Sequence, residues 1–217
     1  MRLKNLISGI AICLGLALPV KAKAGNLILN ADMQSRYAFM GFTYSERPVI
    51  QPYVSFTHNG ITCAFFGSAD VDGLKLKEAD FSVSGEKNVG RATGFFGYGV
   101  LTFPNTGNRK TQEVFIGAYS DLPFNPNIRI SYDFDEGSGV YGTLNAIADL
   151  RIASLSAGLG YNYGYFREGN GFSNADLCLS KSFSVKRVRI TPHINCSIPL
   201  DNDFQRNIFT GLKLELQ

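Results

Sequence analysis

The chain contains two histidines, His58 and His193, and acid–base or nucleophilic catalysis would most readily be built from them. His58 lies in a His-Asn-Gly sequence that is typical of a tight turn. His193 lies on the polar side of an alternating segment, near Ser197. A hydrolase would need a nucleophile motif such as Gly-x-Ser-x-Gly with an orienting acid, and the sequence has no such motif. We therefore expect no enzyme activity and no catalytic residue.

Cysteines and neighbouring carboxylates are the candidates for metal binding. Cys63, Cys178 and Cys196 show no Cys-x-x-Cys spacing, so a zinc site is not expected. Cys178 and Cys196 are predicted on neighbouring strands, where a disulfide is one interpretation. Their alternation instead places them on opposite faces of a sheet, which favours two unbridged residues. Asp70 and Asp72 could hold a cation only weakly, and we expect no metal and no cofactor.

Charged residues on the polar side of alternating segments form the remaining set of candidates. They carry both signs of charge: Glu78, Asp80, Glu113, Arg129, Asp133, Arg187, Arg189, His193, Lys213 and Glu215. One interpretation is that they line a narrow aqueous pore and set its selectivity. The other is that they pair across a filled interior and only stabilise it. The sequence leaves both interpretations open.

The first 24 residues predict a cleaved export signal. Arg2 and Lys4 precede an apolar stretch from residue 6 to 18, and Ala22-Lys23-Ala24 is a small-x-small cleavage site. That apolar stretch is too short to span a bilayer, which needs about 20 residues. We therefore predict a signal peptide over residues 1–24 and one domain over residues 25–217.

Removing this signal changes the charge balance. The full chain has 21 basic and 18 acidic residues, and four of the basic ones and none of the acidic ones lie in residues 1–24. The remaining chain therefore has a net formal charge of about −1 and no basic patch for nucleic acid.

Residues 25–217 alternate between apolar and polar side chains with a period of two. In the last segment Ile208, Leu212 and Leu216 lie on one side, and Phe209 and Lys213 on the other. Turn-rich sequences separate about twelve predicted strands: 29–42, 49–57, 61–69, 77–85, 91–103, 111–120, 127–134, 140–148, 152–165, 173–183, 187–198 and 207–216. Short connections predict an antiparallel up-and-down meander.

A meander of this length must protect its two edges. Closure into a barrel removes unpaired edges, and only a closed barrel satisfies every strand hydrogen bond within lipid. Most predicted strands have the length that a tilted transmembrane strand needs. We therefore predict a closed all-β transmembrane barrel with its apolar side toward lipid, its charges inside, and both chain ends at the periplasmic side because the strand number is even.

Aromatic residues cluster near the predicted strand ends, as the interfacial girdles of such barrels do. The residues concerned are Tyr37, Tyr53, Phe103, Tyr119, Phe134, Tyr141, Tyr163, Tyr165, Phe183 and Phe209. In a soluble sandwich the same residues would form the core.

Several short motifs carry a resemblance to a known family. Residues 35–45, followed by Pro48 and Gln51, resemble an opening pattern of Ser-x-Tyr-x-Phe-x-Gly-x-x-x-Ser with later Pro and Gln. Residues 113–117 resemble a Glu-Val-Tyr-x-Gly element, and residues 177–182 a C-terminal element. These motifs belong to the Gcw_chp family of exported proteobacterial proteins. The resemblance implies an outer-membrane β-barrel and no established activity.

Together these features predict an outer-membrane β-barrel, with a small passive channel or porin-like pore as its working function. Its expected partners are outer-membrane lipid and, during biogenesis, the barrel insertion machinery; the oligomeric state is left open. The alternative is a soluble periplasmic barrel or sandwich that binds a small ligand. An outer-membrane enzyme is a third and less favoured interpretation.

Overall fold

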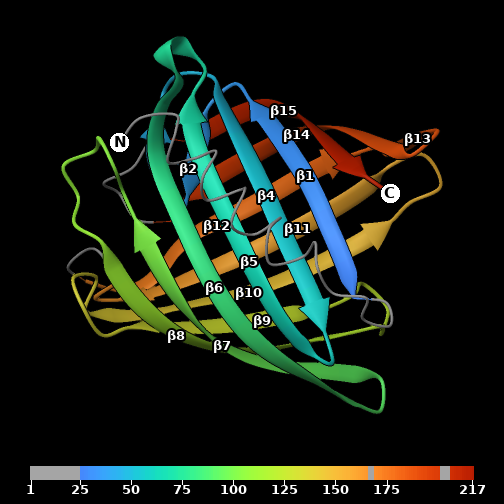
Figure 1. Cartoon of the computed structure of the whole chain (residues 1–217), viewed down its shortest axis with the longest axis horizontal. Helices are drawn as coiled ribbons and strands as arrows, with labels where there is room; N and C mark the ends of the chain where they lie inside the picture. Colours follow the sequence, from blue (N-terminus) through green and yellow to red (C-terminus); the bar gives the residue numbers. More distant parts are fainter. Residues whose placement is uncertain (1–24, 166–168, 201–205) are drawn as a thin grey trace.

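Twelve long antiparallel strands form one closed barrel in the computed structural model of the chain, which describes residues 25–165, 169–200 and 206–217 (Figure 1). The predicted export signal lies outside the described residues. The barrel strands are β1 (Asn26–Gln34), β4 (Val49–His58), β5 (Ile61–Asp70), β6 (Lys75–Val89), β7 (Ala92–Thr102), β8 (Thr111–Ser120), β9 (Asn127–Asp133), β10 (Gly139–Asp149), β11 (Ser154–Tyr163), β12 (Asn170–Ser180), β14 (Val188–Pro199) and β15 (Asn207–Leu216). The predicted fold class is confirmed.

Barrel strands that follow one another in the sequence pair with each other around the whole wall, as an up-and-down meander requires. The wall closes where β1 pairs with β15, with Leu29 opposite Leu216. Because of this register, β1 begins and β15 ends at the same end of the barrel. The connection after Gln34 therefore lies at the opposite end.

The outer face of the wall is apolar and exposed. Ile116 on β8 and Ile208 on β15 are 61% and 70% exposed, and Ile130, Leu144 and Leu177 are exposed in the same way. Monomeric soluble proteins rarely carry so large a continuous apolar surface, whereas a lipid-facing wall must. The outward apolar face therefore supports a membrane barrel rather than the soluble alternative. Among the described residues, no helix is long and apolar enough to cross a bilayer.

The first predicted strand, 29–42, is wrong in its second half. β1 ends at Gln34, and the chain then forms two short strands, β2 (Tyr37–Phe39) and β3 (Phe42–Ser45), in a separate sheet. The period-2 pattern continues past Gln34 because β2 and β3 are also extended, but these two strands pair with each other instead of with the wall.

Two smaller differences between the prediction and the structure lie at the end of the barrel where β1 begins. A short strand, β13 (Phe183–Val185), pairs with the start of β14 and had no counterpart in the prediction. β14 begins at Val188, so Arg187 lies in the exposed β13–β14 turn and not in a strand of the wall. The prediction that Arg187 faces the lumen from a strand is therefore wrong.

The cysteines occupy the positions that alternation predicted. β12 pairs with β14 so that Cys178 lies opposite Asn195 and Leu177 opposite Cys196, which places the two thiols on opposite faces. Cys63, Cys178 and Cys196 are all free.

Candidate functional site: the lumen and its inserted hairpin

A β-hairpin formed by β2 and β3 lies inside the barrel; residues 37–45 are called the lumen hairpin below. Met40 and Gly41 form its tip and both have positive φ, 54° and 82°, as a two-residue turn matching the strand twist requires. Phe39 pairs with Phe42 directly before and after this turn. Met40 is an unusual residue in a left-handed conformation, so its side chain must be held by its surroundings.

The tip of the lumen hairpin packs against aromatic residues from the far wall. Met40 forms a buried cluster with Tyr141 of β10 and Tyr165, with Phe42 packed against it. Gly41 approaches Ser173 and Asn174 of β12, where a Cβ atom would come within 3.4 Å of both residues. The tip thus reaches strands far from the hairpin's own origin between β1 and β4.

Polar contacts fix the two strands of the hairpin. The Tyr37 hydroxyl donates to Glu78 Oε2 of β6 at 2.7 Å, and the Thr43 hydroxyl donates to Asn207 Oδ1 of β15 at 3.0 Å. The Arg36 guanidinium also donates to Asn207 Oδ1, at 3.0 Å. Burial, together with the charge of Glu78, raises the pKa of Tyr37 well above its usual range, so this hydroxyl stays a donor.

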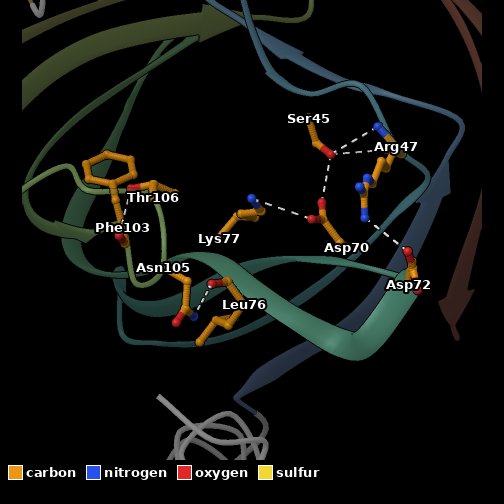
Figure 2. A network of polar contacts seen from close by, with 9 residues as sticks. All are labelled: Ser45, Arg47, Asp70, Asp72, Leu76, Lys77, Phe103, Asn105 and Thr106. Atoms are coloured by element: carbon orange, nitrogen blue, oxygen red, sulfur yellow. Dashed lines mark hydrogen bonds and ion pairs between the residues drawn. The ribbon is translucent and has the colours of Figure 1, made fainter.

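The base of the hairpin is tied to the rim of β5 and β6 (Figure 2). The Ser45 hydroxyl donates to Asp70 Oδ1 at 2.7 Å, and Lys77 Nζ lies 3.5 Å from Asp70 Oδ2. Arg47 pairs with Asp72 at 3.0 Å on the exposed side. Asp70 and Asp72, which could have held a cation weakly, are therefore each engaged by a basic side chain.

A cavity of about 760 Å³ remains in the lumen beside the hairpin. Tyr37, Ala38, Phe39 and Met40 of the hairpin form part of its lining. Most of the rest comes from the inward face of the wall: Gln34, Gln51, Tyr53, Ala64, Phe66, Glu78, Asp80, Ser82, Gly99, Leu101, Glu113, Arg129, Ser131, Tyr141, Thr143, Asn145, Ser156, Gly158, Tyr165, Asp176, Cys178, Asn195, Ser197 and Phe209. The lining thus combines polar and charged side chains with aromatic and other apolar ones.

Four of the ten predicted lumen charges line this cavity: Glu78, Asp80, Glu113 and Arg129. Arg129 donates to Glu113 Oε1 at 2.6 Å and its guanidinium carbon lies 4.0 Å from the centre of the Phe115 ring. The Tyr165 hydroxyl donates to the other oxygen of Glu113 at 2.8 Å. Burial, with the nearby Glu113 charge, raises the pKa of Tyr165 far above its usual range, so it too stays protonated.

The other predicted charges lie outside the cavity lining. Asp133 is fully buried at the end of β9 and accepts hydrogen bonds from the Thr111 hydroxyl. Four others form ion pairs on the wall: Arg189 lies 3.0 Å and Lys213 3.8 Å from Glu215, and His193 lies 2.9 Å from Asp32. Arg187 is exposed in the β13–β14 turn.

Sequence reasoning missed the hairpin and Asp176. A signal for the hairpin was available, because a 14-residue strand exceeds the usual transmembrane length and Gly41 interrupts it. Some expected girdle aromatics also face inward: Tyr37, Tyr53, Tyr141, Tyr165 and Phe209 all line the cavity. The girdle interpretation is wrong for these five residues, since alternation alone does not tell an inserted ring from an interfacial one.

No protein-family model matches this chain, and no curated protein does either. Solved structures share its fold. The KdgM porin superimposes with a TM-score of 0.56 at 10% identity, over 89% of this chain and 99% of that one. The KdgM porin in complex with disordered oligogalacturonate gives 0.55 at 10% identity, with the same coverage.

Fold, outer surface and polar lumen define the class of this protein. A closed twelve-stranded barrel with an apolar outer face has the fold and the outer surface of a membrane-spanning β-barrel, and it shares this fold with the KdgM porin.

Replacing Tyr37 with Phe should loosen the lumen hairpin while leaving the wall intact. The change removes the hydroxyl donor from Glu78, which is only 2% exposed, and should weaken docking by about 1–2 kcal/mol. We expect amide hydrogen exchange in residues 37–45 to become roughly 5- to 30-fold faster. Tyr53→Phe is the matched control, because Tyr53 lines the cavity without a described hydroxyl hydrogen bond. Equal exchange in both variants would contradict the anchoring role of Tyr37.

Proposed function

We propose that this barrel is a passive diffusion channel for small polar solutes, and not an enzyme. The observation that carries the proposal is the cavity of about 760 Å³ that remains between the wall and the lumen hairpin. A barrel whose interior served stability alone would be filled by side chains. Here the inward face carries polar and charged side chains among its aromatic ones and leaves space of the size that small molecules occupy in proteins.

The lumen hairpin gives this channel its narrow point. It crosses from the β1 side of the barrel to Tyr141 on β10 and Asn174 on β12, and its backbone occupies part of the cross-section. The solute must pass beside Tyr37, Phe39 and Met40, which line the cavity. Small hydrophilic molecules fit this arrangement, and large polymers do not.

Planar-bilayer recording and liposome swelling test the proposal directly. We expect the purified barrel to produce discrete small conductance steps and to admit small sugars or amino acids while excluding larger oligomers. Liposomes that contain heat-denatured protein supply the control for leakage. A correctly folded barrel with neither conductance nor swelling would contradict the channel.

Biogenesis and family membership complete the proposal. The predicted route is export through a signal over residues 1–24 followed by barrel insertion machinery. The family resemblance to Gcw_chp rests largely on residues 35–45, and these residues build the lumen hairpin. If the resemblance reflects common descent, related chains should carry the same inward-folded segment.

A further inference from the structure

We infer that the lumen prefers small cations over anions, and this inference rests on the proposed channel function. Among the described residues that line the cavity, four are acidic and one is basic: Glu78, Asp80, Glu113 and Asp176 against Arg129. A narrow conduit with low-dielectric walls concentrates counter-ions of its lining. The balance of charges in this lining therefore decides which solutes accumulate.

The single base does not offset the carboxylates outside its own pair. Arg129 is held by Glu113 at 2.6 Å and lies over the Phe115 ring. Its charge and that of Glu113 therefore largely cancel for a solute in the cavity. Three carboxylates remain: Glu78, Asp80 and Asp176.

Neutral donors surround these three carboxylates. Glu78 accepts from the Tyr37 hydroxyl at 2.7 Å, and Asp176 accepts from the Asn174 amide at 2.6 Å. Asp80 accepts from the Thr102 backbone N–H at 3.3 Å. None of the ion pairs between described residues includes any of the three. Glu78 and Asp80 are two residues apart on one face of β6, so both carboxyl groups lie on the same part of the cavity lining.

The basic groups elsewhere on the inner wall do not reverse this balance. Arg189 and Lys213 both lie beside Glu215, at 3.0 Å and 3.8 Å, and His193 contacts Asp32 at 2.9 Å. Lys77 contacts Asp70 at 3.5 Å on the rim. These four basic groups contact three carboxylates, with Glu215 shared by Arg189 and Lys213, and none of the four lines the cavity.

Aromatic rings beside the carboxylates extend the preference to organic cations. Tyr37 lies 6.4 Å from Phe66 between ring centres, and both rings line the cavity together with Tyr53. Ring faces attract ammonium groups, and carboxylates accept their hydrogen bonds. Small ammonium-bearing solutes are therefore included in the class that the lumen should favour.

Cys178 offers a native reporter for this preference because it lines the cavity two residues after Asp176, on the same face of β12. Its thiolate attacks a methanethiosulfonate reagent, which forms a mixed disulfide and releases methanesulfinate. In a Cys63→Ser, Cys196→Ser background, a trimethylammonium reagent should modify Cys178 at least about tenfold faster than a sulfonate reagent. Both rates are divided by the rate at which the neutral methyl reagent modifies Cys178, because this rate measures how readily an uncharged reagent reaches the thiol.

Variants without the three carboxylates test whether these groups cause the difference in rate between the two charged reagents. Glu78→Gln with Asp80→Asn and Asp176→Asn should abolish the difference between the two reagents, and the potassium-over-chloride preference in bilayers should fall with it. Asp121→Asn removes a carboxylate that pairs with Arg91 on the exposed side, away from the lumen hairpin, and should leave both measurements unchanged. If the triple variant does not show the heat-modifiable mobility of a folded barrel, Asp176→Asn alone replaces it and should reduce the difference.

The possible failures are distinguishable. Equal rates for the two charged reagents, or a faster sulfonate reagent, would overturn the cation preference. Measurable conductance of the same barrel would still support the proposed channel function. A Cys178 that the neutral reagent cannot modify, in a barrel without conductance, would overturn both.

Discussion

Excising the lumen hairpin should raise single-channel conductance several-fold and admit larger solutes in liposome swelling. Gln34 and Val49 are register partners across β1 and β4, so a two-residue Asn-Gly turn can replace residues 35–48 without disturbing the wall. The replacement removes the backbone and the rings that occupy the lumen between Glu78 and Tyr141. The remaining conduit is bounded only by the wall, which should make it wider.

Two comparisons make the excision experiment decisive. Arg91→Ala removes the exposed ion pair with Asp121, keeps the hairpin, and should conduct like the unaltered barrel. Heat-modifiable gel mobility shows that each variant is folded. Should the excised barrel not insert, Met40→Gly provides a milder change, because it removes the side chain that packs against Tyr141 and Tyr165. Unchanged conductance in a folded, excised barrel would show that the constriction lies elsewhere.

Asp133→Ala should be among the most destabilising single substitutions in the wall, at about 3 kcal/mol of unfolding free energy. Asp133 is 0% exposed. Its carboxylate accepts from the Thr111 hydroxyl at 2.7 Å, from the Asp135 N–H at 2.9 Å and from the Gly137 N–H at 3.1 Å. The substitution removes the carboxylate that all three donors share, the Gly137 N–H keeps only the Thr111 hydroxyl oxygen at 3.2 Å, and the β9–β10 connection loses most of its internal support.

Unfolding in urea, followed by gel mobility or circular dichroism, measures this loss, since the chain has no tryptophan to report it. Asp135→Ala is the matched control. The Asp135 carboxylate accepts from Gln112 at 3.0 Å on the exposed side, so its removal should cost less than about 0.5 kcal/mol. Equal stability of the Asp133 and Asp135 variants would refute the structural role assigned to Asp133.

Most of the wall was predictable because its signal is local. The predicted strands 111–120 and 207–216 coincide with β8 and β15, and the outward positions of Ile116 and Ile208 follow from alternation alone. Alternation also placed Cys178 and Cys196 on opposite faces. Lipid contacts every second residue of a strand, so the alternation within one segment is enough to indicate which of its side chains face lipid.

The lumen was predictable only in part. Alternation identified Glu78, Asp80, Glu113 and Arg129 as inward-facing, and these residues do line the cavity. It treated Asp133 in the same way, although that carboxylate holds a connection together at the end of β9. An inward charge in solvent and an inward charge that accepts backbone N–H groups have the same sequence pattern, because their difference depends on residues elsewhere in the chain.

Alternation and the twelve strand-length segments by themselves determined a closed barrel with lipid outside and charges inside. Only the tertiary structure decided that residues 37–45 leave the wall, enter the lumen and divide it. The contacts that hold them join residues 41 positions apart, as for Tyr37 and Glu78, or 164 apart, as for Thr43 and Asn207. Such pairs meet only after the barrel has closed, so a local period of two, which is equally satisfied in the wall and in the hairpin, carries no record of them.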